Sequence, residues 1–479
     1  MSFLDLLLLS LFALQAFCIV NQSPFNELEG VLNTTQGEYR VFRHEDFPSH
    51  SVRIRPIKGF CDPSVDSYAG YIDIEARHMF FYYFESRNDP SKDDVVLWLN
   101  GGPGGSSSLG LFMELGPCKI KSDNETEFNR YSWNTNANML FIDQPVGVAF
   151  SYAEYGESVG TTEEAAKDIA AFLAIFFESM EGLKGRRLHI AGESYGGRYV
   201  PLFAAEVYDQ NRYLTKLGMT PVNLVSAIVG NGCSDRYHSI TSFYDMQCSP
   251  FAGQPIQSIS VCTQMKLALP RCQRALRAHC QEIFDMINCR AAQSFCEDIL
   301  RAPFDLTGKS PYDIRTECFG EVKDTLCYPE TLQLTNFLNL PSTRVALGIE
   351  QSYPNISLVG WSVNEAFEVS GDVFKSSGLH IAALLDHGVR VLIYAGTYDL
   401  VCNFVGNDRL TRELEWHGQK EFIAQPLRDW FVDGKTAGET RAFGGLTFAT
   451  LHDAGHQAPY DRPTESLALI NRWLSDNPL

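Results

Sequence analysis

The sequence contains no cluster of basic residues. Its 39 Lys and Arg residues are outnumbered by 58 Asp and Glu residues, which gives a formal net charge of −19 at pH 7. A protein that binds nucleic acid needs a basic surface facing the phosphates, so this composition argues against a nucleic-acid partner. The sequence pI is near 5.0, and the self-repulsion of the chain therefore fades in a mildly acidic compartment.

Long apolar runs are also absent. No stretch approaches the roughly 18 uninterrupted apolar residues of a membrane-spanning helix. Residues 6–14 form an apolar run of the length of a signal-peptide core, and small residues up to Cys18 offer a cleavage site. No Lys or Arg precedes this run and Asp5 lies at its edge, so an apolar N-terminal helix of the fold is the alternative. We predict a signal peptide over residues 1–18, cleaved at about residues 16–20, and a linker or short pro-segment over residues 21–58.

Four Asn-x-Ser/Thr sequons fit a glycosylated secretory protein. They begin at Asn21, Asn33, Asn124 and Asn355. We therefore expect a protein of the secretory pathway that is either secreted or vacuolar/lysosomal, and the sequence does not choose between these destinations.

Tight C-x2-C pairs are missing from the cysteine-rich part of the chain. Eight of the 13 cysteines lie between residues 248 and 327, with only His279 among them. This density favours a disulfide-stapled subdomain in an oxidising compartment over its alternative, a zinc site. We expect no metal and no cofactor, and a disulfide-rich insert over residues 236–335.

Strand-like and helix-like runs alternate on both sides of this insert. The strand-like runs are residues 69–74, 79–85, 95–99, 139–142, 224–229, 389–394 and 446–451, and the helix-like runs include residues 162–180 and 464–474. Such alternation predicts an α/β fold with a mostly parallel sheet and helices on both faces. We expect its core to occupy residues 59–235 and 336–479.

The pattern G-x-S-x-G occupies residues 192–196, between a strand-like run and a helix-like run. A strand, a tight glycine turn and a helix form the setting of a nucleophile elbow, which exposes a serine hydroxyl above the end of a parallel sheet. The glycines are needed because a side chain there would collide with the strand or the helix. Alone the pattern is weak, but this context makes Ser194 the candidate nucleophile.

A serine hydroxyl needs a base to take its proton, and an acid to hold that base. In this architecture the acid and then the histidine follow the serine, each after a strand. Asp399 follows the strand-like run 389–394, and His456 follows the run 446–451. His452 is the rival, but it falls at the strand end, before the glycine-containing loop, and His456 is favoured.

A glycine-rich stretch, Trp-Leu-Asn-Gly-Gly-Pro-Gly-Gly-Ser-Ser-Ser, occupies residues 98–108 after an apolar strand. A nucleotide-binding loop is one interpretation, but the Gly-Lys-Ser/Thr ending of such loops is missing. An oxyanion hole is the other, with one N–H from this loop and one from Tyr195. We favour the oxyanion hole because it serves the elbow already present.

Five stretches together resemble the serine carboxypeptidases, especially the fungal carboxypeptidase Y type. They are WLNGGPGGSSSLG (98–110), FIDQPVGVAFSY (141–152), AGESYGGRYVP (191–201), YAGTYDLVCN (394–403) and GHQAPYDRP (455–463). The similarity runs from about Cys61 to the C-terminus. It implies an α/β-hydrolase core, a helical disulfide-rich insert over the site, and removal of single residues from peptide C-termini at acidic pH.

The resemblance also assigns roles. It makes Ser194 the nucleophile, His456 the general base and then acid, and Asp399 the orienting acid. It makes the N–H groups of Gly102 and Tyr195 the oxyanion-hole donors.

The family's binding set for the substrate carboxylate corresponds to Asn100, the N–H of Gly101, Glu193 and Glu114. A carboxyl group beside a carboxylate is useful only when it is protonated and can donate a hydrogen bond. Two neighbouring carboxyls hold a shared proton to a higher pH than either alone. The same resemblance implies a pocket for the departing residue lined by Met113, Tyr312, Tyr328, Cys402 and Gln457.

The chain departs from the family pattern at two positions. Gly105 stands where the family has a cysteine, and its usual partner region, residues 345–370, contains no cysteine, which indicates a lost disulfide. Gln457 replaces a methionine, which predicts a more polar pocket. The resemblance further implies a free thiol at Cys402, and the disulfides Cys248–Cys262, Cys272–Cys296, Cys280–Cys289, Cys318–Cys327 and Cys61–Cys118.

Related proteins of this kind have two other functions: acyl transfer between small molecules, and a non-catalytic protective or binding role. The complete triad and carboxylate-binding set favour the peptidase. We expect peptide and protein C-termini as substrates, no nucleic acid and no membrane span, and the sequence leaves the oligomeric state open.

Overall fold

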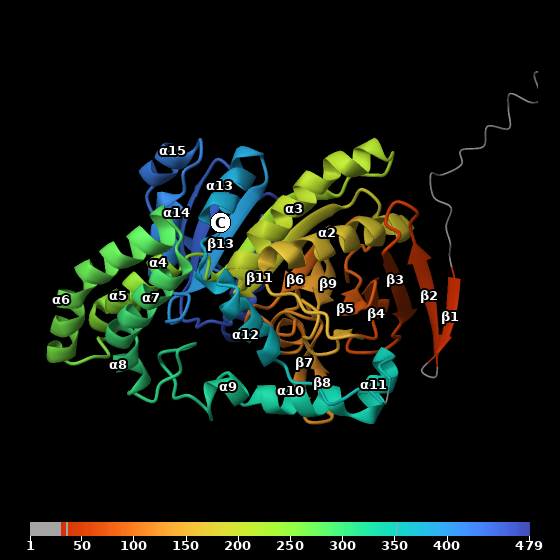
Figure 1. Ribbon diagram of the computed structural model, residues 1–479, viewed down its shortest axis with the longest axis horizontal. Helices are drawn as coiled ribbons and strands as arrows, with labels where there is room; N and C mark the ends of the chain where they lie inside the picture. The colour runs from red at the N-terminus through yellow and green to blue at the C-terminus, as the bar shows by residue number, and fades with distance from the viewer. Residues whose placement is uncertain (1–29, 35–36, 351) are drawn as a thin grey trace, which may run out of the picture.

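The computed structural model describes residues 30–34, 37–350 and 352–479 (Figure 1). The predicted signal peptide and the sequon at Asn21 lie outside the described residues. Asn124 and Asn355 are exposed, as glycosylation requires. In the part of the chain that the structure describes, no helix is both long and apolar enough to cross a bilayer.

One large mixed sheet forms the centre of the molecule. Its strand order is β1-β2-β3-β4-β5-β9-β6-β11-β12-β13-β16-β15-β14, with β10 paired to β5. The strands from β9 to β16 in this order are parallel, and the two flanks are antiparallel. The strands are β4 (Ser67–Ile74), β5 (Arg77–Phe84), β6 (Val95–Leu99), β9 (Asn138–Ile142), β10 (Tyr152–Ala153), β11 (Arg187–Ser194), β12 (Asn223–Gly232), β13 (Arg390–Gly396), β14 (Arg428–Val432), β15 (Lys435–Phe443) and β16 (Leu446–Leu451).

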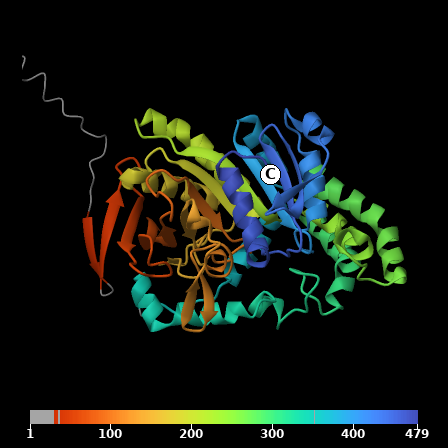
Figure 2. The same ribbon diagram turned by 180° about the vertical axis from the view of Figure 1, so that it is seen from behind.

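Helices cover both faces of this sheet, as the α/β-hydrolase fold requires. The strands β6 and β9 are buried along their whole length because both of their faces are covered, and all their residues except Asn138 are apolar. Figure 1 shows the helices α2 (Thr162–Ser179), α3 (Gly196–Lys216) and α13 (Gly378–Asp386) on one face. Figure 2 shows the C-terminal helix α17 (Pro463–Leu474) on the opposite face.

The N-terminal part of the described chain differs from our prediction of a linker. Here the strands β1 (Gly30–Thr34), β2 (Gly37–Arg43) and β3 (His50–Pro56) extend the sheet in antiparallel fashion. Tyr39 and Val41 in β2, and Val52 and Ile54 in β3, are buried. This alternation is the signature of a half-buried strand, and the many polar residues between these positions hid it.

The region between β12 and β13 is mostly helical. It contains α4 (Arg236–Thr241), α5 (Phe243–Cys248), α6 (Ile259–Leu276), α7 (Met286–Leu300), α8 (Ala302–Asp305), α9 (Val322–Thr325), α10 (Glu330–Asn339), α11 (Pro341–Leu347) and α12 (Trp361–Val369). The green helices α4 to α8 project from one end of the sheet in Figure 1 and have their own apolar core, which includes Phe243, Met265 and Leu276.

Further elements connect these layers. They include a π-helical turn (Gly110–Glu114), the two-stranded ribbon β7 (Cys118–Ser122) and β8 (Glu125–Phe128), and the helices α14 (Phe404–Glu413), α15 (Gln419–Ala424) and α16 (Ala458–Asp461).

The described residues contain six disulfides. The five pairs implied by the resemblance are present: Cys61–Cys118, Cys248–Cys262, Cys272–Cys296, Cys280–Cys289 and Cys318–Cys327. The sixth joins Cys233 to Cys402. The expectation of a free thiol at Cys402 is therefore wrong.

Candidate active site

Ser194 lies at the turn between β11 and α3. Its φ is +63°, a left-handed conformation that a residue with a side chain adopts only where the surroundings impose it. A Cβ on Gly192 would lie 2.7 Å from the carbonyl oxygen of Leu99 on the neighbouring strand. Glycine at this position lets the turn pack closely enough to raise the serine above the sheet edge.

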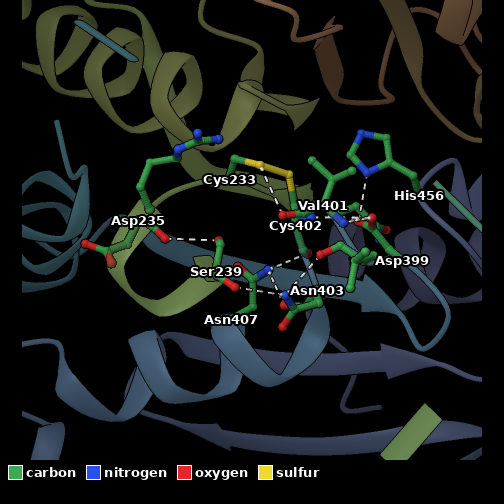
Figure 3. Close-up of a disulfide and its surroundings, with 12 residues drawn as sticks. Cys233, Asp235, Ser239, Asp399, Val401, Cys402, Asn403, Asn407 and His456 are labelled. Atoms are coloured by element: carbon green, nitrogen blue, oxygen red, sulfur yellow. Dashed lines mark hydrogen bonds and ion pairs between the residues drawn. A yellow bond between two sulfur atoms is a disulfide. The ribbon is translucent and has the colours of Figure 1, made fainter. Parts of the chain in front are cut away.

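His456 and Asp399 meet at the same edge of the sheet. The His456 Nδ1 lies 2.7 Å from the Asp399 Oδ2, and both side chains are buried (Figure 3). The Asn231 side-chain amide donates to Asp399 Oδ2 at 2.9 Å, and the Val401 N–H donates to Oδ1 at 2.9 Å. These donors fix the carboxylate, which in turn orients the imidazole and leaves Nε2 as its second nitrogen.

The structure thus brings together the three residues that the sequence predicted for the triad. Ser194 and His456 line one cavity of about 280 Å³. His452, the rival histidine, lies apart: its backbone N–H donates to the Ala437 carbonyl in the β15–β16 region.

The glycine-rich loop passes directly over the elbow. A Cβ on Gly101 would contact the backbone N of Tyr195, and Gly102 and Gly104 have φ angles of +109° and +88°. Gly102, Ser194 and Tyr195 together line a second cavity, of about 460 Å³. The two candidate oxyanion donors therefore flank Ser194.

Asp143 holds this loop from beneath. Its Oδ1 accepts hydrogen bonds from Ser106 Oγ at 2.6 Å and from the Ser107 N–H at 3.2 Å. Burial raises the pKa of Asp143 to about 7, and the hydrogen bond from Ser106 opposes this shift.

Asn100 presents its amide to the first cavity. Its Oδ1 accepts hydrogen bonds from the Trp98 indole and from the Gly110 N–H, both at 2.9 Å. With the oxygen occupied, the side-chain NH₂ is the part of the amide that can donate, to the neighbouring Glu114 and to a ligand. Asn100, Gly101 and Glu193 all line the cavity beside Ser194.

Glu193 and Glu114 form a buried acidic pair behind Asn100. Glu193 is 3% exposed and Glu114 is 1% exposed. Burial raises the pKa of Glu114, and it raises the pKa of Glu193 well above its usual range, with the negative charge of Glu114 as the second cause. The pair therefore retains a proton at a pH where ordinary carboxyls have lost theirs.

The first cavity also receives three of the five residues expected in the pocket, namely Tyr312, Tyr328 and Gln457. Met113 and Cys402 do not line it: Met113 is buried in the core, and Cys402 is buried in its disulfide. Sequence reasoning missed the apolar part of the lining, which is Leu109, Val322, Leu326, Val359 and Trp361.

Most of these missed residues come from α9 and α12 and their flanks. No local pattern marks them, because they reach the cavity only when the last part of the insert and the chain after it fold back over the sheet edge. Leu109 is the exception, since it directly follows the glycine-rich stretch.

The donor atoms of Asp399, Cys402 and His456 lie within 4.8 Å of one another. Cys402 offers no thiolate because it is oxidised to a disulfide with Cys233, and the facing atoms of Asp399 and His456 bind each other. This set does not fit the ligand requirements of a metal ion.

Comparison with known proteins gives a consistent result. The family model for serine carboxypeptidases matches residues 58–476. The chain is 37% identical to carboxypeptidase Y of Candida albicans over 451 residues, which are 93% of this chain and 80% of that protein. It is 38% identical to the vacuolar serine-type carboxypeptidase ATG42 of Saccharomyces cerevisiae over 89% of this chain and 83% of that protein.

A solved structure has the same fold. It is the prohormone-processing carboxypeptidase Kex1Δp of Saccharomyces cerevisiae, with a TM-score of 0.73 and 23% sequence identity. The match covers 87% of this chain and 92% of that chain.

Proposed function

This chain belongs to the serine carboxypeptidase family, and on that premise we propose that Ser194, His456 and Asp399 carry out its reaction. The protein is a serine-type carboxypeptidase that releases C-terminal amino acids from peptides and proteins at acidic pH. The observation that carries the assignment is one cavity that holds both the Ser194–His456 pair and the Asn100–Glu193 pair.

The first half of the reaction forms an acyl-enzyme. His456 accepts the proton of Ser194 while Oγ attacks the last peptide carbonyl, and Asp399 stabilises the resulting imidazolium. The N–H groups of Gly102 and Tyr195 bind the oxyanion of the tetrahedral intermediate. His456 then gives the proton to the departing amino group, and the C-terminal amino acid leaves.

The second half regenerates the enzyme. A water molecule attacks the acyl-enzyme carbonyl while His456 takes its proton, and collapse of the intermediate returns the proton to Ser194 Oγ. The peptide shortened by one residue then dissociates.

The carboxylate-binding set confines the reaction to chain ends. The terminal carboxylate accepts hydrogen bonds from the Asn100 amide, the Gly101 N–H and a protonated Glu193, which shares its proton with Glu114. An internal peptide bond offers no carboxylate at this position and leaves these buried donors without partners, which is costly. The requirement for a protonated carboxyl gives acidic pH its advantage.

The apolar lining of the first cavity surrounds the side chain of the departing residue. Leu326, Val359 and Trp361 surround the side-chain position, and Gln457 adds a buried polar atom. The larger cavity on the other side of Ser194 takes the acyl part of the peptide.

The protein acts in the secretory pathway, either secreted or in a vacuole or lysosome. The curated relatives include a vacuolar enzyme, and the six disulfides require an oxidising compartment in which to form.

The test is release of a free amino acid from an N-blocked dipeptide at pH 5. We expect release from the dipeptide acid, much slower release from the matched dipeptide amide at the same pH, and none by Ser194→Ala. An enzyme that transfers the acyl group to an added alcohol but does not hydrolyse the dipeptide is an acyltransferase. Binding of the dipeptide without turnover identifies a protective or binding protein. Either result overturns the proposal.

A further inference from the structure

The disulfide between Cys233 and Cys402 links the two halves of the triad. Cys233 directly follows β12, and its N–H donates to the carbonyl oxygen of Ser194 at 2.8 Å. The residue is therefore one hydrogen bond away from the nucleophile. A Cβ on Gly197, at the start of α3, would lie 2.8 Å from the same nitrogen, which shows how closely this segment packs on the elbow.

The other end of the disulfide lies in the loop that carries the acid. Cys402 is three residues beyond Asp399, and its N–H donates to Asp399 Oδ1 at 3.4 Å, beside the donation from Val401 at 2.9 Å. Asp399 Oδ2 in turn holds His456 Nδ1 at 2.7 Å. Figure 3 shows this continuous path from the disulfide through the loop to His456.

This disulfide differs from the others in what it connects. The other five described disulfides join residues 9 to 57 positions apart, whereas Cys233 and Cys402 are 169 positions apart. The two cysteines follow the adjacent parallel strands β12 and β13, so the bond ties neighbouring strand ends together above the sheet.

Hydrogen bonds restrain the acid loop on its far side. The Asn407 amide donates to the Cys402 carbonyl at 2.9 Å, and the Asn403 side chain caps α14 by accepting from the Gly406 N–H at 2.8 Å. These contacts fix the loop to its own helix. The disulfide is the covalent contact between this loop and the segment that holds Ser194.

We propose that the Cys233–Cys402 disulfide is a positioning bond that holds Asp399, and through it His456, in register with Ser194. This proposal rests on the triad assignment above, and it goes beyond it by giving the two cysteines a role in turnover. Cys402 is completely buried, and Cys233 is half-buried and lines the larger cavity beside Ser194, so the bond also forms part of the wall on the acyl side.

Loss of the disulfide should lower kcat more than it weakens peptide binding. A displacement of about 1 Å between reacting groups can cost about 100-fold in rate. The carboxylate-binding residues Asn100, Gly101 and Glu193 line the smaller cavity, which neither Cys233 nor Cys402 lines, so peptide KM should change little.

The test compares the single variants Cys233→Ala and Cys402→Ala with the double variant. We expect each single variant to lose about 10-fold to 100-fold in kcat, with KM within about twofold of the wild type. The double variant should be no worse than either single variant, because one bond is lost in all three. The double variant Cys248→Ala/Cys262→Ala removes an insert disulfide and should keep the kcat of its folded fraction.

The rate at which a fluorophosphonate labels Ser194 gives a second readout, which depends on the triad and the oxyanion hole and on no peptide substrate. We expect labelling to slow in parallel with kcat. Labelling at the wild-type rate in the Cys233→Ala and Cys402→Ala variants overturns the positioning role. If the protein fails the dipeptide test while labelling of the two variants is still slowed, the carboxypeptidase function is overturned and the positioning bond remains supported.

Reduction tests the same bond in the unaltered protein. A dithiol such as dithiothreitol reduces the disulfide to two thiols and is itself oxidised to a cyclic disulfide, so two electrons and two protons are transferred. Mild reduction that is confirmed by mass spectrometry at Cys233 and Cys402 should lower kcat, and reoxidation should restore it. The double variant Cys233→Ala/Cys402→Ala should not respond to either treatment, and an equal response of this variant overturns the proposal.

Discussion

The two sides of Ser194 are held by different chemistry. On one side, the glycine-rich loop is fixed without any covalent link, by backbone pairing and by a buried acid. On the other side, the loop that carries Asp399 is fixed by a disulfide to the segment beside the elbow. In the proposed mechanism, both loops keep a catalytic group in place above the sheet edge.

Backbone pairing attaches the glycine-rich loop to the chain around Val359. The Ser106 N–H donates to the Leu358 carbonyl and the Gly360 N–H donates to the Gly104 carbonyl, both at 2.8 Å, around the bridge between Gly105 and Val359. This loop thus stays attached to the chain after the insert, in the region where the family has its disulfide.

Because one loop is held by hydrogen bonds near buried acids and the other by a disulfide, the two loops should respond to different changes of solution conditions. Asp143, Glu114 and Glu193 are all associated with the glycine-rich side, and burial raises the pKa of each. We therefore expect this side to respond to pH. The Asp399 side depends on a covalent bond, and we expect it to respond to reductants.

Removing the base gives the largest effect. His456→Ala should lower kcat by about 10⁴-fold or more because the Ser194 hydroxyl loses its proton acceptor, and Ser194→Ala should do the same because it removes the nucleophile. Steady-state kinetics with a blocked dipeptide measures this loss. The matched variant His452→Ala should lower kcat only slightly, and the triad assignment is wrong if His452→Ala is the inactive protein.

Distorting the glycine-rich loop of the oxyanion hole should lower kcat less than removal of the base does. Gly102→Ala places a Cβ 2.6 Å from the backbone N of Gly105 at a φ of +109°, so the backbone of the loop must shift. We expect kcat to fall by about 10²-fold to 10³-fold, the usual loss for one oxyanion donor. The control is Gly185→Ala, which has a φ of +73° and open space around it and should keep wild-type turnover. Unchanged kcat in Gly102→Ala would remove this loop from the oxyanion hole.

The acidic pair should make peptide binding depend on pH. In the wild type, KM for peptides should rise by up to about tenfold per pH unit once the shared proton of Glu193 and Glu114 is lost. KM for a matched ester, which has no terminal carboxylate, should stay nearly constant. The double variant Glu193→Gln/Glu114→Gln should flatten the peptide profile, whereas Glu415→Gln, an exposed site, should not. Identical KM profiles for peptide and ester in the wild type would contradict carboxylate recognition by this pair.

Asp143 should make stability depend on pH. Its folded-state pKa of about 7 lies above the unfolded value, so the folded protein holds the extra proton, and this stabilisation is lost as pH rises through 7. Between pH 5 and 8 the group alone should reduce the free energy of unfolding by about 2 to 3 kcal/mol. Denaturant unfolding of Asp143→Asn at both pH values should show a correspondingly smaller fall.

Asp372 provides a control because its pKa is lowered, whereas that of Asp143 is raised. Hydrogen bonds from Arg198 hold its pKa below the usual value despite burial, so it is ionised throughout this pH range. Asp372→Asn should lower stability by the same amount at pH 5 and at pH 8. A wild-type protein whose stability does not fall in this range, or falls equally in Asp143→Asn, would contradict the role of Asp143.

The smallest effect concerns Gln457, beside the base. Its buried Oε1 has no hydrogen-bond partner among the described residues, so it can accept a hydrogen bond from a polar departing side chain. Gln457→Met should reduce kcat/KM for a C-terminal Asn about fivefold relative to Leu, the value of one hydrogen bond. Equal ratios in wild type and variant would exclude Gln457 from specificity.

Local sequence determined the catalytic centre to a large extent. The elbow at residues 192–196, the Asp399 position and the glycine-rich stretch each follow an apolar strand, and the ends of parallel strands necessarily meet at one sheet edge. Chemistry that depends on such local patterns can be predicted from a single chain, as the His456–Asp399 contact illustrates.

Tertiary structure alone decided three features. The strands β1–β3 appear as a linker in sequence because their buried alternation is masked by charged neighbours. The cavity walls from α9 and α12 carry no pattern, since only the return of the chain over the sheet brings them to Ser194. Cys233 and Cys402 are far apart in sequence, and they became neighbours because β12 and β13 pair in parallel. Strand order, which long-range packing sets, brought these two cysteines together and placed a disulfide beside the triad where a free thiol was expected.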